Sequence, residues 1–507
     1  METKSGPLFG LTEANGETAS ERLLAHLCRQ SFLSLWSHPN TFTDEGVRDE
    51  NTSSGKEFAD VLVVFGDDIV IFSDKHIHFN ESISVDVAWP RWFKSAITRS
   101  VRQLYGAMNW ALRFPNRIYL DAACKKPLPV PLPPMDRARF HLVATTRGTY
   151  GACAKHFAGS IGSHQINTAV SGEEHHGRPF TVGIVERGRK FVHVFDEFSL
   201  EAVLRELDTA SDFISYLNAR EELLASRAVV IAAGEEQLLA AYMTNMRGDD
   251  HWFLSTQEPG SLPDLVFFDE SHWPGLQARP EYKAKKVADR KSYFWDELIS
   301  RFIHEGNPAI VGASTSGKDV EVALRIIASR SRLERRILSD TLFTALKTAR
   351  ERPPARRVRL FSLLQQPEVA YAFLVDPMQC GEDYAEYRRR RSSFLQVYLQ
   401  CARLRMPNAT TFIGMAFDHP AKDYAGGSED LAVYLRPEDS EVDLAELRRI
   451  ADEIGILSSD LPMRHSSIQE FPSQPSEVPA TIAPRSRKRS VGRSKMAKAS
   501  RRKNRRK

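Results

Sequence analysis

The stretch that decides the fold is Phe58–His76, with the sequence FADVLVVFGDDIVIFSDKH. Two runs rich in Val, Ile, Leu and Phe are separated by Gly66, Asp67 and Asp68, a pattern typical of a β-hairpin. Because neither run alternates apolar with polar residues, we expect both faces of these strands to be covered by other parts of the chain. The stretch therefore predicts a buried pair of strands.

The turn of this hairpin determines which side chains share a face. If Gly66 and Asp67 are the two central turn residues, as a type II′ turn with Gly first requires, Asp60 lies opposite Ser73. Residues two apart on a strand point to the same side of the sheet, so Lys75 shares a face with Ser73. A carboxylate and an ammonium group then meet at the open end of an apolar hairpin.

A second register is also compatible with the sequence. If the turn is formed by Asp67 and Asp68, Asp60 lies directly opposite Lys75, and in the first register Asp74 points to the other face. An acid and a lysine at the mouth of a buried sheet are costly to desolvate unless they bind a ligand or each other. The alternative to a functional site is therefore an ordinary salt bridge that closes the hairpin.

Two amphipathic segments flank the hairpin. Thr18–Trp36 has apolar residues close to a 3.6-residue period and predicts a helix that carries Glu21. Pro90–Leu112 predicts a second helix, which begins at a proline and carries Gln103. The order along the chain is then helix, strand, strand, helix.

This arrangement resembles the PD-(D/E)XK nuclease superfamily, which has the restriction-endonuclease-like fold. That family runs from a helix with a Glu, through a strand that opens with Asp, to a neighbouring strand that ends in acid-x-Lys, and then to a helix that often carries a Gln. The matching positions here are Glu21, Asp60, Lys75 and Gln103. The resemblance covers the amino-terminal region only.

One position departs from the family pattern. The family has its second acid two residues before the lysine, where this chain has Ser73. Asp74 could take that role if a bulge at the strand end turned its carboxylate inward, and otherwise Glu57, three residues before Asp60, could supply the missing ligand. If neither carboxylate reaches the site, the resemblance implies an inactive relative.

The resemblance also implies a chemistry. A divalent cation, Mg²⁺ or Mn²⁺, would be held by Glu21, Asp60 and Asp74, since Mg²⁺ prefers one or two carboxylates with water and phosphate oxygen. Lys75 would orient the attacking water and stabilise charge on phosphorus, and Gln103 would be a positioning residue. The expected activity is hydrolysis of phosphodiester bonds in nucleic acid, with DNA favoured over RNA.

The expected fold class is α/β, with a mixed sheet flanked by helices in the amino-terminal domain and further α/β or α+β regions after it. Five prolines in Pro127–Pro134 indicate an extended linker. The predicted divisions are a nuclease-like domain (1–126), a linker (127–134), a middle region (135–262), a carboxy-terminal region (263–460), and a disordered linker with a basic tail (461–507). Residues 135–460 are expected to select the substrate or to contact protein partners.

The charge is distributed unevenly along the chain. Arg485–Lys507 contains 13 Lys and Arg residues and no acid. The net charge of the whole chain is +4, so removing these 13 positive charges leaves −9 for the other 484 residues. A tail of this composition predicts disorder and salt-sensitive attraction to a polyanion such as nucleic acid, although it could also fold against the acidic body of the chain.

The remaining composition excludes several classes. Five cysteines without a C-x-x-C pair encode neither a disulfide framework nor a zinc knuckle, so we expect a reducing, cytoplasmic setting. No apolar run approaches the length of a membrane span, so we expect neither a signal peptide nor a membrane partner.

One further segment has two interpretations. The run Arg388–Arg391 is interleaved with Tyr384, Tyr387 and Phe394. It could form a basic aromatic surface that stacks on bases, or a solvated helix face beside a core stripe.

Overall fold

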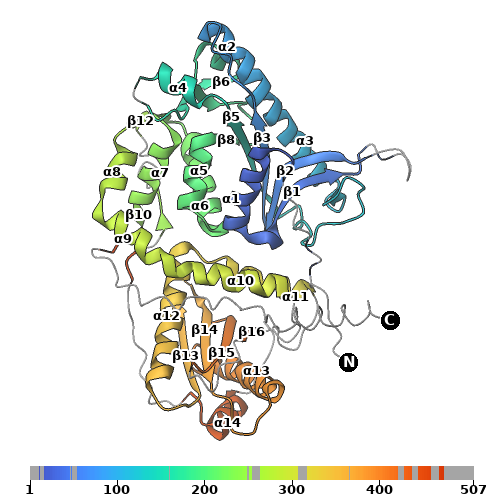
Figure 1. Cartoon of the computed structure of the whole chain (residues 1–507), viewed down its shortest axis with the longest axis vertical. Helices are drawn as coiled ribbons and strands as arrows, with labels where there is room; N and C mark the ends of the chain where they lie inside the picture. The colour runs from blue at the N-terminus through green and yellow to red at the C-terminus, as the bar shows by residue number, and fades with distance from the viewer. Residues whose placement is uncertain are drawn as a thin grey trace, which may run out of the picture.

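The structure, a computed structural model, describes residues 9, 11, 16–45, 47, 54–158, 160–247, 250–253, 263–305, 317–364, 366–420, 428–436, 444–457 and 468–472. The described part is α/β, with mixed sheets flanked by helices, as the sequence predicts (Figure 1). The basic tail Arg485–Lys507 lies outside the described residues.

The amino-terminal sheet has the strand order β4-β1-β2-β3-β5-β8. Its strands are β1 (Ser37–Thr43), β2 (Lys56–Phe65), β3 (Asp68–His76), β4 (Ile118–Tyr119), β5 (Arg139–Arg147) and β8 (Val192–Asp196). Adjacent strands are antiparallel in the first part of this order, β4-β1-β2-β3. In the second part, β3-β5-β8, they are parallel. The sheet is therefore mixed, and its parallel strands end at one edge.

The hairpin adopts the first of the two predicted registers. Phe65 pairs with Asp68 around Gly66 and Asp67, and Gly66 has a φ of +64°, which a glycine adopts without strain. The continuously apolar strands are buried, as expected from their lack of alternation.

Helices cover both faces of this sheet. The buried ring of Phe72 stacks on Phe213 of α6 (Ala210–Leu224), whereas the next residue, Ser73, contacts Gln103 of α3 (Arg99–Arg113). Successive strand residues point to opposite faces, so α6 and α3 lie on opposite sides. With α6 lie α1 (Ala19–Trp36) and α5 (Glu197–Glu206).

The helix predicted at Pro90–Leu112 begins earlier than expected. It consists of α2 (Val85–Phe93), a π-helical turn (Lys94–Thr98) and α3, and Pro90 lies inside α2 rather than at its first turn. The sequence rule that places proline at a helix start was wrong here.

The Pro-rich segment does not separate two folding units. Pro127 forms an isolated bridge with Tyr119, and the strand that follows the segment, β5, pairs with β3 over its whole length from Asp68–Arg139 to His76–Arg147. Residues before and after the prolines therefore build one sheet, and the division predicted at 127–134 is corrected by this pairing. Proline content signals an extended connection but not the end of a sheet.

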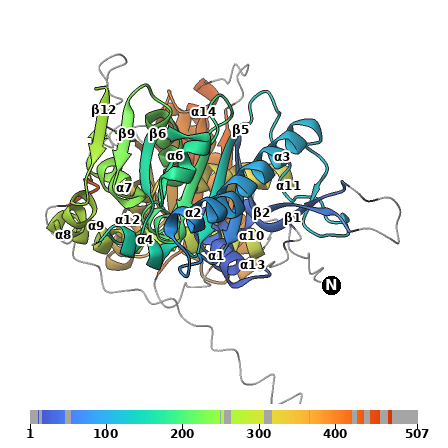
Figure 2. The ribbon, with the colours of Figure 1, turned by 90° about the horizontal axis from the view of Figure 1, so that it is seen from above.

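A second sheet has the order β12-β9-β6-β7, and residues of its strands β6 and β7 line a cavity together with residues of β8. Its strands are β6 (Gln165–Ser171), β7 (Thr181–Ile184), β9 (Val229–Ala232) and β12 (Leu265–Phe268). The other elements of this part are α4 (Tyr150–His156), α7 (Glu235–Thr244), β10 (Met246–Arg247), β11 (Asp250–His251), α8 (His272–Ala278) and α9 (Pro280–Asp289). Figure 2 shows this sheet next to the amino-terminal one, with helices packed below.

The third sheet belongs to the carboxy-terminal region. It has the order β13-β14-β15-β16, with only β14 and β15 parallel. The elements are α12 (Arg332–Glu351), β13 (Arg357–Leu363), β14 (Gln366–Asp376), α13 (Tyr384–Cys401), β15 (Thr411–Asp418), β16 (Glu429–Leu435) and α14 (Leu444–Ile454). Helices α10 (Tyr293–Glu305) and α11 (Gly317–Ala328) lie between this sheet and the rest of the molecule (Figure 1).

Neither interpretation of Arg388–Arg391 describes α13 correctly. Arg391 is fully buried and binds Asp418 and Asp430, and Arg390 binds Asp376. Arg388, Arg390 and Arg391 therefore turn inward to acids on the sheet, whereas Arg389 is exposed, and the helix sequence alone could not reveal this.

Among the described residues, none of the helices has both the length and the apolar character needed to span a bilayer.

Candidate active site at the open end of the hairpin

The two hairpin strands diverge at Asp60. Regular pairing of β2 with β3 extends from Phe65–Asp68 to Val61–Phe72. Beyond it, the side chain of Asp60 replaces a backbone partner, because its Oδ2 accepts a hydrogen bond of 2.6 Å from the backbone N–H of Asp74. The buried Asp60 carboxyl therefore lies between the diverging strands.

A β-bulge brings a second acid to the same face. Thr41 of β1 pairs with Ala59 of β2, but the next residue, Phe42, pairs with Glu57, so β2 contains one extra residue. An extra residue reverses the alternation of side chains. Glu57 therefore faces the same side as Asp60, and their carboxyl groups are in hydrogen-bonding contact. The bulge considered for Asp74 in the sequence is found on the neighbouring strand instead.

The surroundings of Asp60 favour its protonated form. Burial, followed by the hydrogen bond with Glu57, raises the pKa of Asp60 to about 8, although the charge of Lys75 and the N–H of Asp74 act in the opposite direction. Lys75 is close enough to act on Asp60, but the ion pairs within 4.0 Å in the described part of the chain do not include this pair. The alternative of a simple salt bridge across the hairpin is therefore wrong in this structure.

Ser73 lies on the same face and contacts the helix above it. Its hydroxyl is 3.3 Å from Oε1 of Gln103 and 3.3 Å from Oγ of Ser100, both on α3. Ser73 is 1% exposed, so these contacts satisfy a buried hydroxyl. Gln103 of α3 therefore lies beside Ser73 at the open end of the hairpin.

Asp74 points to the other face of the sheet. Its Oδ1 accepts hydrogen bonds from Oγ1 of Thr145 at 2.6 Å and Nε of Arg147 at 3.3 Å, both on β5. Pairing of β3 with β5 continues without a shift past Asp74, so no bulge turns the carboxylate toward Asp60. The buried Oδ2 of Asp74 has no hydrogen-bond partner in the described part of the structure.

Glu21 forms part of the N-terminal cap of α1. Its Oε2 accepts hydrogen bonds from the backbone N–H groups of Glu17 and Thr18, and Thr18 caps the helix in return. The described residues contain no group of three or more His, Cys, Asp or Glu side chains that is arranged to hold a metal ion. The predicted ligand set of Glu21, Asp60 and Asp74 is therefore not assembled.

What the structure assembles is Glu57, Asp60 and Lys75, with Ser73 and Gln103 behind them. Two carboxyl groups that share a hydrogen bond provide hard oxygen donors, and the lysine provides a positive charge beside them. Thr145 and Arg147, which hold Asp74, were missed in the sequence because nothing there signals that β5 pairs with β3.

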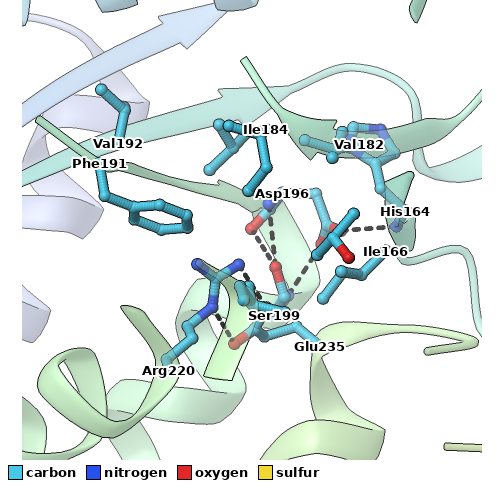
Figure 3. Close-up of a pocket in the computed structure, with 14 residues that line it drawn as sticks. His164, Ile166, Val182, Ile184, Phe191, Val192, Asp196, Ser199, Arg220 and Glu235 are labelled. Atoms are coloured by element: carbon cyan, nitrogen blue, oxygen red, sulfur yellow. Dashed lines mark hydrogen bonds and ion pairs between the residues drawn. The ribbon is translucent and has the colours of Figure 1, made fainter. Parts of the chain in front are cut away.

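A small enclosed cavity lies between β8 and the second sheet. Its volume of about 20 Å³ leaves room for roughly one water molecule. Figure 3 shows the side chains of Arg220 and Glu235 bonded to each other in this cavity. Arg220 donates to Glu235 at 2.7 and 2.8 Å, so this buried pair is satisfied internally and stabilises the packing of α6 against α7.

Comparison with protein-family models, with curated proteins and with solved structures finds no match to this chain.

Proposed function

We propose that this chain is a metal-dependent nuclease of the PD-(D/E)XK type, whose centre consists of Glu57, Asp60 and Lys75. The observation that carries the proposal is the contact between the two carboxyl groups beside Lys75, at the open end of the hairpin. Titratable groups with strongly perturbed pKa values and a specific charged neighbour are enriched at functional sites.

The residues present fit a divalent cation such as Mg²⁺ or Mn²⁺. Asp60 is buried with a raised pKa, so it holds a proton next to Glu57 that a cation could replace. Mg²⁺ is commonly bound by one or two protein carboxylates together with water and substrate phosphate, which is the number available here. When bound, the cation would lower the pKa of a water molecule and polarise the phosphate.

The side chains of this site have distinct roles in the proposal. Glu57 and Asp60 would hold the cation, and the N–H of Asp74 would fix the orientation of the Asp60 carboxylate. Lys75, half-buried at the end of β3, would orient the attacking water and stabilise negative charge on phosphorus. Ser73 and Gln103, which contact each other on the face of the sheet that carries Asp60, would be positioning residues.

One observation favours a second candidate function. Ser73 stands where the resembled family has its second acid, and its hydroxyl is already engaged by α3. A chain with this substitution could bind nucleic acid without cutting it, through the basic tail Arg485–Lys507.

A plasmid-nicking assay with Mg²⁺ or Mn²⁺ tests the proposal. The wild-type chain should nick DNA, and Asp60→Asn should reduce the rate by about 1000-fold, since it removes the buried ligand with little change in shape. Asp67→Asn, in the turn at the other end of the same hairpin, is the matched control and should cut normally.

The two candidates separate in the same experiment. If the wild-type chain binds DNA but never cuts DNA or RNA with either cation, the nuclease proposal is wrong and the binding function remains. In that case, removal of residues 485–507 should abolish the salt-sensitive binding. Cleavage that survives Asp60→Asn unchanged would contradict the proposed site.

A further inference from the structure

The helix that covers the proposed site carries a row of positive charges on its outer face. The segment from α2 to α3, Val85–Arg113, contains a single acid, Asp86. Its basic residues are Arg91, Lys94, Arg99, Arg102 and Arg113. All five are exposed, and none of them forms an ion pair within the described part of the chain. We call these five residues the basic stripe.

The spacing of the basic stripe places its members on one face of the helix. Successive members are three, five, three and eleven residues apart. The interval of five spans the π-helical turn Lys94–Thr98, in which one turn takes more residues than in an α-helix, and eleven residues make three α-helical turns. The opposite face is buried in the core through Trp89, Trp92, Ile97, Val101 and Leu104. The basic stripe therefore faces solvent over about 33 Å, at 1.5 Å per residue.

The same helix runs past the open end of the hairpin. Ser100 and Gln103 of α3 both contact the hydroxyl of Ser73, so the first turns of α3 lie directly over the proposed site. Toward α2, Nε1 of Trp92 donates a hydrogen bond of 2.8 Å to the carbonyl oxygen of Ile77, which lies two residues beyond the lysine of the site. Figure 1 shows α2 and α3 in line along this side of the amino-terminal sheet. A ligand held along the basic stripe would therefore pass the proposed site.

The local charge is opposite to that of the rest of the chain. The 484 residues before Arg485 have a net charge of −9, since the whole chain has +4 and the tail contributes +13. Five exposed cations in a row without neighbouring acids favour a ligand that carries a row of negative charges. Their span of about 33 Å is close to one turn of B-DNA, about 34–36 Å. The phosphate backbone of nucleic acid has this charge and this length.

The aromatic residues of the helix distinguish a duplex from a single strand. Proteins that bind single strands combine a positive groove with exposed aromatic rings on which bases stack. Here the rings between the ends of the basic stripe are buried or engaged: Trp92, Phe93 and Tyr105 are at most 3% exposed, and Trp110 is half-buried beneath the guanidinium of Arg117. The stripe therefore offers contacts to phosphates and not to bases, which suits a double-stranded ligand.

From these observations we propose that the basic stripe binds the phosphate backbone of double-stranded DNA and orients the duplex along α2 and α3, past the proposed active site. The inference rests on the proposed function, because DNA is the substrate proposed for that site, but the contact itself needs neither a cation nor cleavage. Each member of the stripe neutralises about one phosphate, and the contact covers about ten base pairs.

Fluorescence anisotropy of the full-length chain with a labelled duplex of two helical turns, in EDTA, tests the proposal. The triple variant Lys94→Gln/Arg99→Gln/Arg102→Gln should weaken duplex binding about 100-fold at about 0.1 M salt, since three phosphate contacts are lost. The slope of log affinity against log salt concentration should become shallower by about 3. All three positions are exposed, so the variant should melt like the wild type.

Two further variants make this test specific. Arg279→Gln/Lys283→Gln/Arg290→Gln, on and at the ends of α9, removes the same charge from exposed positions in another part of the molecule and should bind the duplex like the wild type. Asn109→Lys adds a cation at an exposed position between Arg102 and Arg113, and should tighten duplex binding about tenfold. A misfolded variant could not produce such a gain.

The proposal is overturned if the stripe variant binds the duplex like the wild type, if the α9 variant loses as much affinity, or if the stripe variant loses equal affinity for a single strand of the same length. Stripe-dependent binding to vesicles of phosphatidylcholine and phosphatidylserine that is as tight as duplex binding would also overturn it, in favour of a membrane surface.

The nuclease proposal can fail separately. Asp60→Asn should keep the duplex affinity of the wild type, because the stripe lies outside the cation site. A wild-type chain that never cuts DNA, with duplex affinity that still depends on the stripe, would contradict the nuclease and leave the binding surface. A wild-type chain that cuts DNA, with duplex affinity unchanged in the stripe variant, would do the reverse.

Discussion

The amino-terminal and carboxy-terminal sheets both carry carboxylates where strands end, but they neutralise them differently. In the carboxy-terminal sheet, Asp376 and Asp418 are aligned at the ends of the parallel strands β14 and β15. Arg390 binds Asp376 at 2.6 Å, and the fully buried Arg391 binds Asp418. In the amino-terminal sheet, the carboxyl group of Asp60 is hydrogen-bonded to another acid, Glu57, and not to an arginine.

This difference distinguishes the acids of the carboxy-terminal sheet, whose charge is structural, from Asp60, which is a candidate functional group. Buried acids that are bonded to arginines need no ligand, because their charge and hydrogen-bonding capacity are satisfied within the fold. Among the described residues, one backbone N–H and a nearby lysine offset burial and the hydrogen bond with Glu57, so the pKa of Asp60 rises to about 8. The less compensated acid is the better candidate for binding a cation.

We expect the largest change in stability in the carboxy-terminal sheet, where arginines neutralise the buried acids. Arg391→Leu should destabilise the carboxy-terminal region by about 3–5 kcal/mol, because Asp418 and Asp430 would lose a shared buried cation. Denaturant unfolding measures this loss. Arg389→Leu, an exposed neighbour on the same helix, should change stability by less than about 0.5 kcal/mol. Equal effects of the two substitutions would mean that the buried network is not structural.

At the proposed site in the amino-terminal sheet, Lys75→Ala should change activity rather than stability. The rate of DNA nicking should fall about 100-fold, since one positively charged donor near the reacting phosphate is lost. The melting temperature should stay close to that of the wild type, because Lys75 makes no close ion pair with Asp60. Lys155→Ala, which breaks an exposed ion pair with Glu81, controls for the loss of a positive charge. A melting temperature of Lys75→Ala well below that of the wild type would indicate instead that Lys75 has a structural role.

Ser73→Asp sharpens the comparison by adding an acid to the site that is already short of positive charge. Ser73 shares a face with Asp60, so a third carboxylate should tighten Mn²⁺ binding about tenfold. The same substitution should lower stability without metal, because like charges repel in a buried setting. Thermal unfolding with and without Mn²⁺ measures both effects, and unchanged Mn²⁺ affinity would exclude Ser73 from the site.

The smallest effect is the pH dependence of stability. The folded pKa of Asp60, about 8, is above the ordinary value of 3.8, so the folded state binds more protons than the unfolded state between these values. Stability from this group is therefore present at low pH and lost as pH rises toward 8. Asp60→Asn should melt about 2–4 °C higher than the wild type near pH 8, and this gap should close at acidic pH.

The same proton links pH to metal binding. A cation must displace it, so Mn²⁺ affinity of the wild type should rise with pH up to about 8, by roughly tenfold for each pH unit. Calorimetry in buffers of different ionisation heat would detect the released proton. Affinity that is independent of pH would mean that Asp60 is not a ligand.

The sequence by itself determined the local geometry. The turn residues left two registers of β2 with β3 open, and in either of them alternation places Asp60, Ser73 and Lys75 on one face and Asp74 on the other. The structure has the register with Gly66 and Asp67 in the turn. These features depend only on neighbouring residues, because turn type and strand periodicity are short-range properties. The amphipathic period likewise located α1 and most of α3.

Only the tertiary structure decided which acid accompanies Asp60. The bulge that turns Glu57 to the site arises from pairing with β1, and Arg147 reaches Asp74 because β5 joins β3 across the proline-rich segment. Contacts between strands that are distant in sequence are set by packing of whole layers, which leaves no periodic or turn signal in the chain.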